Sequence, residues 1–319
     1  IHCDVPVEFH IEELIRKDMD GEALTYDFQD LEMNSLITQV EALSGNGVVV
    51  LEQPDKNYQT ILTQTDLDLL ITTISNAELI SFDLETTSIT PLQAAIVGLS
   101  FSVKANDGYY IPVEYPEKES KPGLTLDAVL EKLKPIFENE NNRFCGQNIK
   151  YDALVLSRYG IHLGNIVFDT MIAEYMLHPE KNSYKMDYLS IDYLNYRMVP
   201  IDNLIGTGLH QKSMAEVPLE DIAFYASEDA DIAFQLSGIL KDKLEEESLF
   251  EPYNDIEIPL IPVLTTIEKN GVYLNLDFLA ELSRNFGEKL EKLTEKIHQL
   301  AGREFNINSP KQLGEILFD

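Results

Sequence analysis

An apolar run that ends in two acids occupies positions 79–85, Leu79-Ile80-Ser81-Phe82-Asp83-Leu84-Glu85. The run predicts a buried strand over residues 79–83. Because residues i and i+2 of a strand point to the same face, Asp83 and Glu85 can converge on one cation. An Asp-x-Glu pair is common and usually marks a strand that leaves the core for solvent. Here the preceding run is apolar, and acids that emerge from a buried strand need charge compensation.

The flanking sequence alternates strand and helix signals. A strand meander followed by alternating helices indicates an α/β domain with a mixed sheet. The predicted strands are 79–83, 95–103, 109–113 and 143–146, and the predicted helices are 65–74 (with Thr65 as N-cap), 125–138, 149–159, 170–177, 186–195 and 219–245. Further along, a helix punctuated by prolines ends at Asn270-Gly271, an amphipathic helix runs from Asp277 to Ala301, and Ser309-Pro310 begins another.

A second acid follows the short strand at 143–146. Asp152 ends the run Asn148-Ile149-Lys150-Tyr151-Asp152 and lies in the first turn of the predicted helix. Acids in a first turn are often there only because they favour the helix dipole. That explanation accounts for Asp152 but not for the polar residues Gln147, Asn148 and Lys150 beside it.

A third signal lies on the helix predicted over 219–245. Positions i and i+4 share a helix face, so Tyr225 and Asp229 lie side by side. The plain alternative is a half-buried tyrosine beside a surface acid. The residues around the pair are apolar, which predicts a partly buried Asp229 that needs a metal or another cation. Asp231 is rotated away, and we interpret it as a solvated or structural acid.

Composition limits the classes of partner. The 319 residues carry a formal net charge of −31 and only two cysteines. Proteins that bind duplex DNA are usually basic, so we expect this chain alone to hold DNA weakly. No apolar run reaches the length of a membrane span, no signal peptide is visible, and the few cysteines fit a reducing cytosol. The chain lacks an initiator Met, and we expect a fragment of a longer protein.

The three acid motifs, in this order and on these elements, resemble the DEDD exonuclease superfamily in its tyrosine subgroup. Further stretches are similar to the proofreading domain of bacterial family A DNA polymerases. They are Ser81–Thr86, Val97–Phe101, Gly146–Asp152, Phe168–Met171 and Tyr225–Asp231. The resemblance implies a ribonuclease H-like fold, a mixed sheet flanked by helices, and a 3′-5′ exonuclease that releases 5′-nucleotides from DNA.

The resemblance also covers the ends of the chain. Ile258–Leu264 and Ile267–Val272 resemble the entry into the polymerase domain of that family, and Phe305–Leu313 resembles the base of its thumb. Val5–Phe9 resembles the tail of a 5′-nuclease domain. These matches imply a linker or nuclease tail at 1–55, an exonuclease domain at 56–250 and a truncated start of the polymerase domain at 251–319. The polymerase carboxylates would be absent, so we expect no DNA synthesis by this fragment.

The resemblance implies roles for the matched acids. Asp83, Glu85 and Asp229 would bind one metal, and Asp83 would bridge to a second that Asp152 helps to hold through water. Tyr225 and Glu85 would orient the attacking water. Ligands that are all oxygen suit two divalent cations, Mg²⁺ or Mn²⁺.

Six further residues match positions near the DNA strand: Thr86, Ile89, Gln147, Asn148, Lys150 and Tyr151. Ile89 matches an apolar wedge between the last two bases, and a plain core residue is the equal alternative. Asn148 and Lys150 would contact phosphate or position Asp152. Lys212, near a Gly-x-Gly loop, would approach single-stranded DNA or belong to an ordinary connector. Asp169 is interpreted as a helix N-cap, not as a ligand.

Three functions stay open. The first is a proofreading exonuclease that takes a single-stranded or frayed 3′ end of DNA, since a mispaired terminus melts at lower cost. The second is an RNA-trimming exonuclease of the ribonuclease D type, and the third is a catalytically silent scaffold domain. For the first we expect a monomer in the bacterial cytoplasm, associated with the nucleoid through DNA, with no membrane partner and with the remainder of a polymerase chain attached.

Overall fold

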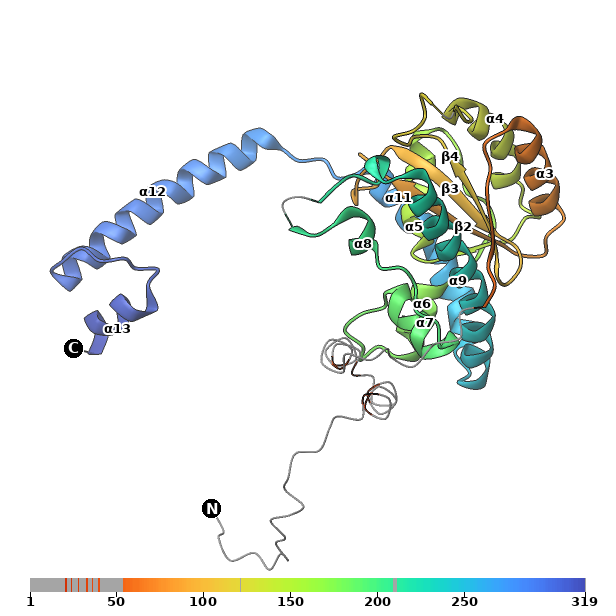
Figure 1. Cartoon of the computed structure of the whole chain (residues 1–319). Helices are drawn as coiled ribbons and strands as arrows, with labels where there is room; N and C mark the ends of the chain where they lie inside the picture. Colours follow the sequence, from red (N-terminus) through yellow and green to blue (C-terminus); the bar gives the residue numbers. More distant parts are fainter. Residues whose placement is uncertain are drawn as a thin grey trace, which may run out of the picture. The chain divides into compact units, whose positions relative to one another are not determined.

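The computed structural model describes residues 54–318 except 121, 209 and 210, together with positions 21, 24, 28, 33, 36 and 40. The segment that we interpret as a nuclease tail, 1–55, therefore lies almost entirely outside the described residues. The chain divides into two compact units, one that ends at Lys269 and one that begins at Asn270 (Figure 1).

The first unit is built on a mixed sheet of six strands. Their spatial order is β1-β4-β3-β2-β5-β6. The pairs β4–β3 and β3–β2 are antiparallel, whereas β1–β4, β2–β5 and β5–β6 are parallel. The strands are β1 (Asn57–Thr60), β2 (Ile80–Thr86), β3 (Ile96–Ser102), β4 (Asp107–Pro112), β5 (Phe144–Gly146) and β6 (Ile166–Asp169). The predicted α/β class and its mixed sheet are confirmed.

Helices cover both faces of this sheet (Figure 1). Within residues 54–270, the helices are α3 (Gln64–Ser75), α4 (Leu126–Phe137), α5 (Ile149–Arg158), α6 (Thr170–Leu177), α7 (Met186–Leu194), α8 (Ile201–Ile205), α9 (Leu219–Glu246), α10 (Phe250–Pro252) and α11 (Ile258–Asn270). A 3₁₀ turn at Met214–Glu216 precedes α9, and a π-helical turn at Tyr253–Glu257 precedes α11.

One face of the sheet carries the apolar core. Phe82 of β2 lies opposite Phe101 of β3, and both rings pack against Phe137 of α4. Helix α3 adds its own buried leucines to this layer. Its N-cap is Thr63, whose hydroxyl accepts the N–H of Asp66, so the predicted cap at Thr65 was wrong by half a turn.

The opposite face carries small and polar side chains, and helix α9 lies across it. Ser81, Ser100 and Ser102 are buried on this face. Helix α9 itself is rich in buried alanine and serine, which lets its backbone approach the strands closely. The two faces follow from the strict alternation of side chains along a strand. This second face is the one that holds Asp83 and Glu85.

Both edge strands escaped the sequence analysis. Strand β1 is mostly exposed and has the polar sequence Asn57-Tyr58-Gln59-Thr60, so it lacks the apolar run that marked the other strands. Strand β6 is only four residues long and passes directly into α6. Asp169 stands at that junction, and its side chain accepts the N–H groups of Met171 and Ile172. The prediction that Asp169 is a helix N-cap is confirmed.

The second unit contains the helices α12 (Leu276–Ala301) and α13 (Pro310–Phe318). Gly271 has a φ of 69° just after α11, as the predicted left-handed cap requires. Asn275 caps α12 by accepting the N–H of Phe278. In the described part of the chain, no helix is both long and apolar enough to cross a membrane.

Candidate active site

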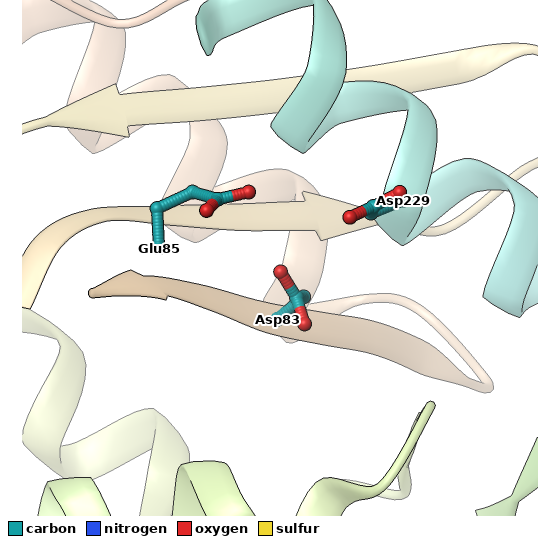
Figure 2. Close-up of side chains that lie close together, drawn as sticks. All are labelled: Asp83, Glu85 and Asp229. Atoms are coloured by element: carbon teal, nitrogen blue, oxygen red, sulfur yellow. The ribbon is translucent and has the colours of Figure 1, made fainter. Parts of the chain in front are cut away.

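Three carboxylates from two distant segments meet over the polar face of the sheet. Figure 2 shows the side chains of Asp83 and Glu85, from β2, and Asp229, from α9, pointing toward one another. One oxygen of each lies within 4.8 Å of the others. Asp83 and Asp229 are far apart in the sequence, so the cluster exists only because α9 crosses the sheet at this point. Its oxygen-only donors form a carboxylate cluster of the kind that holds a divalent cation.

Asp152 is buried nearby but is held differently. It lies in the first turn of α5, as predicted, and is 2% exposed. Its Oδ1 accepts the backbone N–H of Leu84 at 3.2 Å. The pairing of β2 with β5 stops at Ser81 and Cys145, so the carboxylate takes the place of a strand partner beyond that point. Asp152 therefore lines the same cleft without belonging to the three-acid cluster.

Tyr225 precedes Asp229 by one helical turn, and their side chains are hydrogen-bonded. Burial, followed by the charges of Asp229, Glu85 and Asp83, raises the pKa of Tyr225 far above its usual range. The phenol is therefore protonated at neutral pH. It can donate a hydrogen bond to an oxygen in the cleft, and it is not a base.

Burial also disfavours the charged form of all four acids. It raises the pKa of Asp83 to about 6. The pKa values of Glu85, Asp152 and Asp229 rise well above their usual range, through burial first and then through the charge of Asp83. Among the described residues, no lysine or arginine forms an ion pair with any of the four. Glu85 Oε1 is buried without a hydrogen-bond partner. Such a donor set fits a bound cation.

Helix α9 is anchored by a second buried acid two residues beyond the cluster. Asp231 is fully buried, and it accepts hydrogen bonds from Lys56 Nζ at 2.7 Å, Tyr58 Oη at 2.8 Å and the N–H of Asn106 at 2.7 Å. Gln235 Nε2 donates to it as well. Of our two interpretations of Asp231, the structural acid is correct and the solvated acid is wrong.

Glu228 anchors the same helix to the wall of the cleft. It is fully buried and accepts hydrogen bonds from Tyr196 Oη at 2.6 Å and from the N–H of Val199 at 2.7 Å. The Lys56 ammonium lies 4.4 Å from the centre of the Tyr196 ring. Residues 196–199 lead into α8, whose Ile201 and Ile205 line the cleft. Glu228 and Asp231 together fix the rotation of α9 and therefore the direction of Asp229.

The carboxylates lie in a cleft of about 1030 Å³. Ile89 lines it and is 96% exposed, which rules out the plain core alternative. The turn before Ile89 is held by Tyr151, whose hydroxyl lies 2.5 Å from both Thr86 Oγ1 and the Ser88 carbonyl oxygen. An exposed isoleucine on a turn fixed in this way can present an apolar surface to a base.

The other residues matched to the DNA path lie in different settings. Gln147 donates to the Tyr184 carbonyl and pairs with Thr170. Asn148 lines the cleft and has a left-handed backbone, with φ of 55°. Lys150 is not among the lining residues, and its ammonium is paired with Glu268 of α11.

Comparison with known proteins shows the family of the chain. Residues 58–245 match a family model described as 3′-5′ exonuclease. The chain belongs to this family. Residues 276–319 match the DNA polymerase family A model.

Relatives and a solved structure extend the match. DNA polymerase I of Pseudomonas aeruginosa is 36% identical across all of this chain, which covers 36% of that protein. DNA polymerase I of Chloroflexus aurantiacus is 37% identical over 80% of the chain, which covers 27% of that protein. The chain thus spans about a third of the length of these relatives. A Pol1 structure from M. smegmatis, described as a complex with DNA primer-template and dNTP, shares the fold with a TM-score of 0.67, 18% identity and coverage of 82% of this chain and 41% of that one. Residues 58–245 therefore form a domain of the 3′-5′ exonuclease family, and residues 276–319 are similar to part of DNA polymerase family A.

Two lysines also line the cleft, Lys185 at the N-cap of α7 and Lys212 after α8. The sequence offers Lys212 as a residue near single-stranded DNA or as part of an ordinary connector, and it gives no signal for Lys185. Neither belongs to a motif with fixed spacing, so only the tertiary structure shows that they line the cleft.

Asp229 and Asp231 should respond in opposite ways to loss of charge. Asp229→Asn removes repulsion from the buried cluster, and we expect it to stabilise the metal-free protein by about 1–3 kcal/mol. Asp231→Asn leaves the buried Lys56 ammonium without its anion and should cost about 3–5 kcal/mol. Urea unfolding in chelator measures both changes. Equal destabilisation by the two substitutions would show that Asp229 is not under electrostatic strain.

Stability without metal should fall as the pH rises. The pKa of Asp83 is 3.8 when unperturbed and about 6 in the folded chain, so the folded state binds more protons in that window. The melting temperature in chelator should therefore decrease from about pH 4 to about pH 7, as the pH rises through the folded pKa of Asp83. Excess Mn²⁺ should reduce the decrease by compensating the ionised acids. The matched control is Asp83→Asn/Asp229→Asn, whose pH dependence in chelator should be flatter. If the double variant shows the same decrease of melting temperature with pH, the decrease comes from the overall negative charge of the chain and not from this cluster.

Proposed function

We propose that this chain hydrolyses the 3′-terminal phosphodiester of DNA and releases 5′-nucleotides, as the proofreading part of a DNA polymerase. The convergence of Asp83, Glu85 and Asp229 is the observation that carries the proposal. Among the described residues, this buried carboxylate cluster forms no ion pair with a lysine or arginine, so it suits divalent cations. The cation proposed is Mg²⁺, or Mn²⁺ in its place.

The four acids would divide between two cations. Asp83, Glu85 and Asp229 would hold one cation, and Asp83 and Asp152 would hold the other. When bound, such cations lower the pKa of a water and stabilise the charge on the attacking and leaving oxygens of phosphodiester hydrolysis. The protonated phenol of Tyr225, held by Asp229, would donate a hydrogen bond that orients the attacking water. Glu85 would accept a hydrogen bond from the same water.

The cleft would receive a single-stranded or frayed 3′ end. Ile89 packs against the terminal bases, on a turn held by Thr86 and Tyr151. Gln147 and Asn148 lie along the strand path. Lys150 is proposed to contact phosphate or to position Asp152, although Glu268 holds its ammonium in this structure. Selectivity for a mispaired terminus would come from melting, because an unpaired end frays at lower cost.

We further propose the setting in which the domain works. Residues 56–250 form the exonuclease domain, 251–319 begin a polymerase domain, and 1–55 connect to a preceding nuclease region. The whole protein acts as a monomer on DNA in the bacterial cytoplasm, at the nucleoid and without a membrane partner. In that protein the polymerase portion supplies most of the affinity for DNA, because the strongly acidic exonuclease portion binds phosphate poorly.

Degradation of a 5′-labelled single-stranded DNA oligonucleotide in Mn²⁺ tests the proposal. We expect stepwise shortening from the 3′ end that Asp83→Ala/Glu85→Ala abolishes, with a loss of at least about 10³-fold because both ligands of a shared cation are removed. A matched RNA oligonucleotide should be degraded more slowly. Faster cleavage of RNA would favour the ribonuclease D alternative. Failure of the wild type to shorten either substrate or to bind Mn²⁺ would favour a silent scaffold.

Ile89 supplies a second test, on the substrate side of the cleft. Ile89→Ala should leave the free energy of unfolding unchanged, because the side chain is 96% exposed. Loss of its contact with the bases should lower kcat/KM on single-stranded DNA by about 10-fold, corresponding to loss of roughly 1–2 kcal/mol of apolar contact. Leu69→Ala, at an exposed leucine of α3, is the matched control. Equal activity of Ile89→Ala and the control would contradict the wedge role.

A further inference from the structure

Tyr110 of β4 is a buried tyrosine whose hydroxyl has no hydrogen-bond partner among the described residues. Leaving such a group unsatisfied costs free energy, and native proteins rarely do so without a reason. Glu85 Oε1 is a second buried atom without a partner. One group is a donor and the other an acceptor, and both lie on the same side of the sheet.

The strand register places the two side chains together. Asp83, Ser100 and Tyr110 form one row across β2, β3 and β4, so their side chains share the face that α9 covers. Glu85 and Gly98 form the next row on that face. A tyrosine reaches diagonally across a strand to the neighbouring row. The ring of Tyr110 therefore extends from its own row toward Glu85.

Gly98 provides the space for that reach. A Cβ atom on Gly98 would lie 2.2 Å from Tyr110 Oη and 2.3 Å from the adjacent ring carbon. Directly opposed residues of an antiparallel pair direct their side chains to the same face. The Tyr110 hydroxyl thus occupies the volume of the missing side chain directly across from Glu85. Burial and then the charges of Glu85 and Asp83 raise the pKa of Tyr110, which is consistent with this proximity.

We propose that Tyr110 is a positioning residue whose phenol O–H, without a partner in the metal-free structure, donates a hydrogen bond to the Glu85 carboxylate when a cation is bound and so orients that carboxylate toward the cation. Because Gly98 has no side chain, it leaves the space that the Tyr110 ring occupies. The inference rests on the proposed function, since it assigns Glu85 to the metal. Groups that hydrogen-bond to a metal ligand fix its orientation and raise metal affinity. Tyr110 touches neither substrate nor metal, and it acts through Glu85.

Tyr110→Phe tests the role with little change of shape. The phenylalanine ring still fills the space over Gly98. Loss of a hydroxyl that has no partner in the metal-free chain should leave the free energy of unfolding in chelator equal or higher. We expect about 10-fold weaker Mn²⁺ binding by titration calorimetry, within the range seen when partners of metal ligands are removed. A merely structural tyrosine would instead lose stability and keep its Mn²⁺ affinity. Mn²⁺ affinity within about twofold of the wild type would overturn the proposal.

Double variants that combine Tyr110→Phe with Glu85→Gln or with Asp152→Asn identify the partner of Tyr110. In Glu85→Gln, adding Tyr110→Phe should weaken Mn²⁺ binding much less than it does in the wild type, because the carboxylate that it orients is gone. In Asp152→Asn the effect of Tyr110→Phe should persist in full. An undiminished effect in Glu85→Gln would overturn the assignment to Glu85. If the wild type itself binds no Mn²⁺, the proposed function fails together with this inference. If the wild type binds and Tyr110→Phe binds equally well, only the inference fails.

Discussion

Mutual repulsion among Asp83, Glu85 and Asp229 is the constraint on which the rest of the domain depends. Three carboxylates that approach within 4.8 Å in a buried place favour separation or protonation. The fold prevents the three acids from separating, because strand β2 and helix α9, which carry them, are held by contacts that do not involve the acids. Strand β2 is paired on both sides, by β3 and by β5. Helix α9 is held through Asp231, whose ion pair with Lys56 lies outside the cluster.

The anchors of α9 show how one helix carries opposite kinds of acid. Asp231 and Glu228 are fully buried but fully partnered, with an ammonium, phenols and backbone N–H groups around them. Asp229 lies between them in the sequence, and among the described residues its only hydrogen-bond partner is the phenol of Tyr225. The hydrogen bonds of Asp231 and Glu228 hold the helix in one orientation, and in that orientation Asp229 faces the cleft. The difference in partners separates structural carboxylates from those suited to a cation.

The two faces of the sheet divide stability from chemistry. On one face, phenylalanines of β2, β3 and β5 pack with α4 into an apolar core. On the other face, serines, a glycine and two acids leave room for α9 and for a polar site. Because side chains alternate along β2, the strand serves both purposes with every second residue. The unpartnered hydroxyl of Tyr110 lies on this second face, where it can donate a hydrogen bond to a carboxylate that binds a cation.

The sequence by itself determined the local features of this protein. Apolar runs and helical spacing predicted most elements to within a few residues, and the three motifs selected four acids and a tyrosine as a group. Tertiary structure alone decided how those residues are used. It brought Asp229 to Asp83 and Glu85, attached Asp152 to the backbone of Leu84, exposed Ile89, and paired Lys150 with Glu268. It also added the polar edge strand β1 and the reach of Tyr110 over Gly98. The physical reason is that periodicity encodes which face of an element a residue occupies, whereas its neighbours across that face depend on packing between segments far apart in the chain.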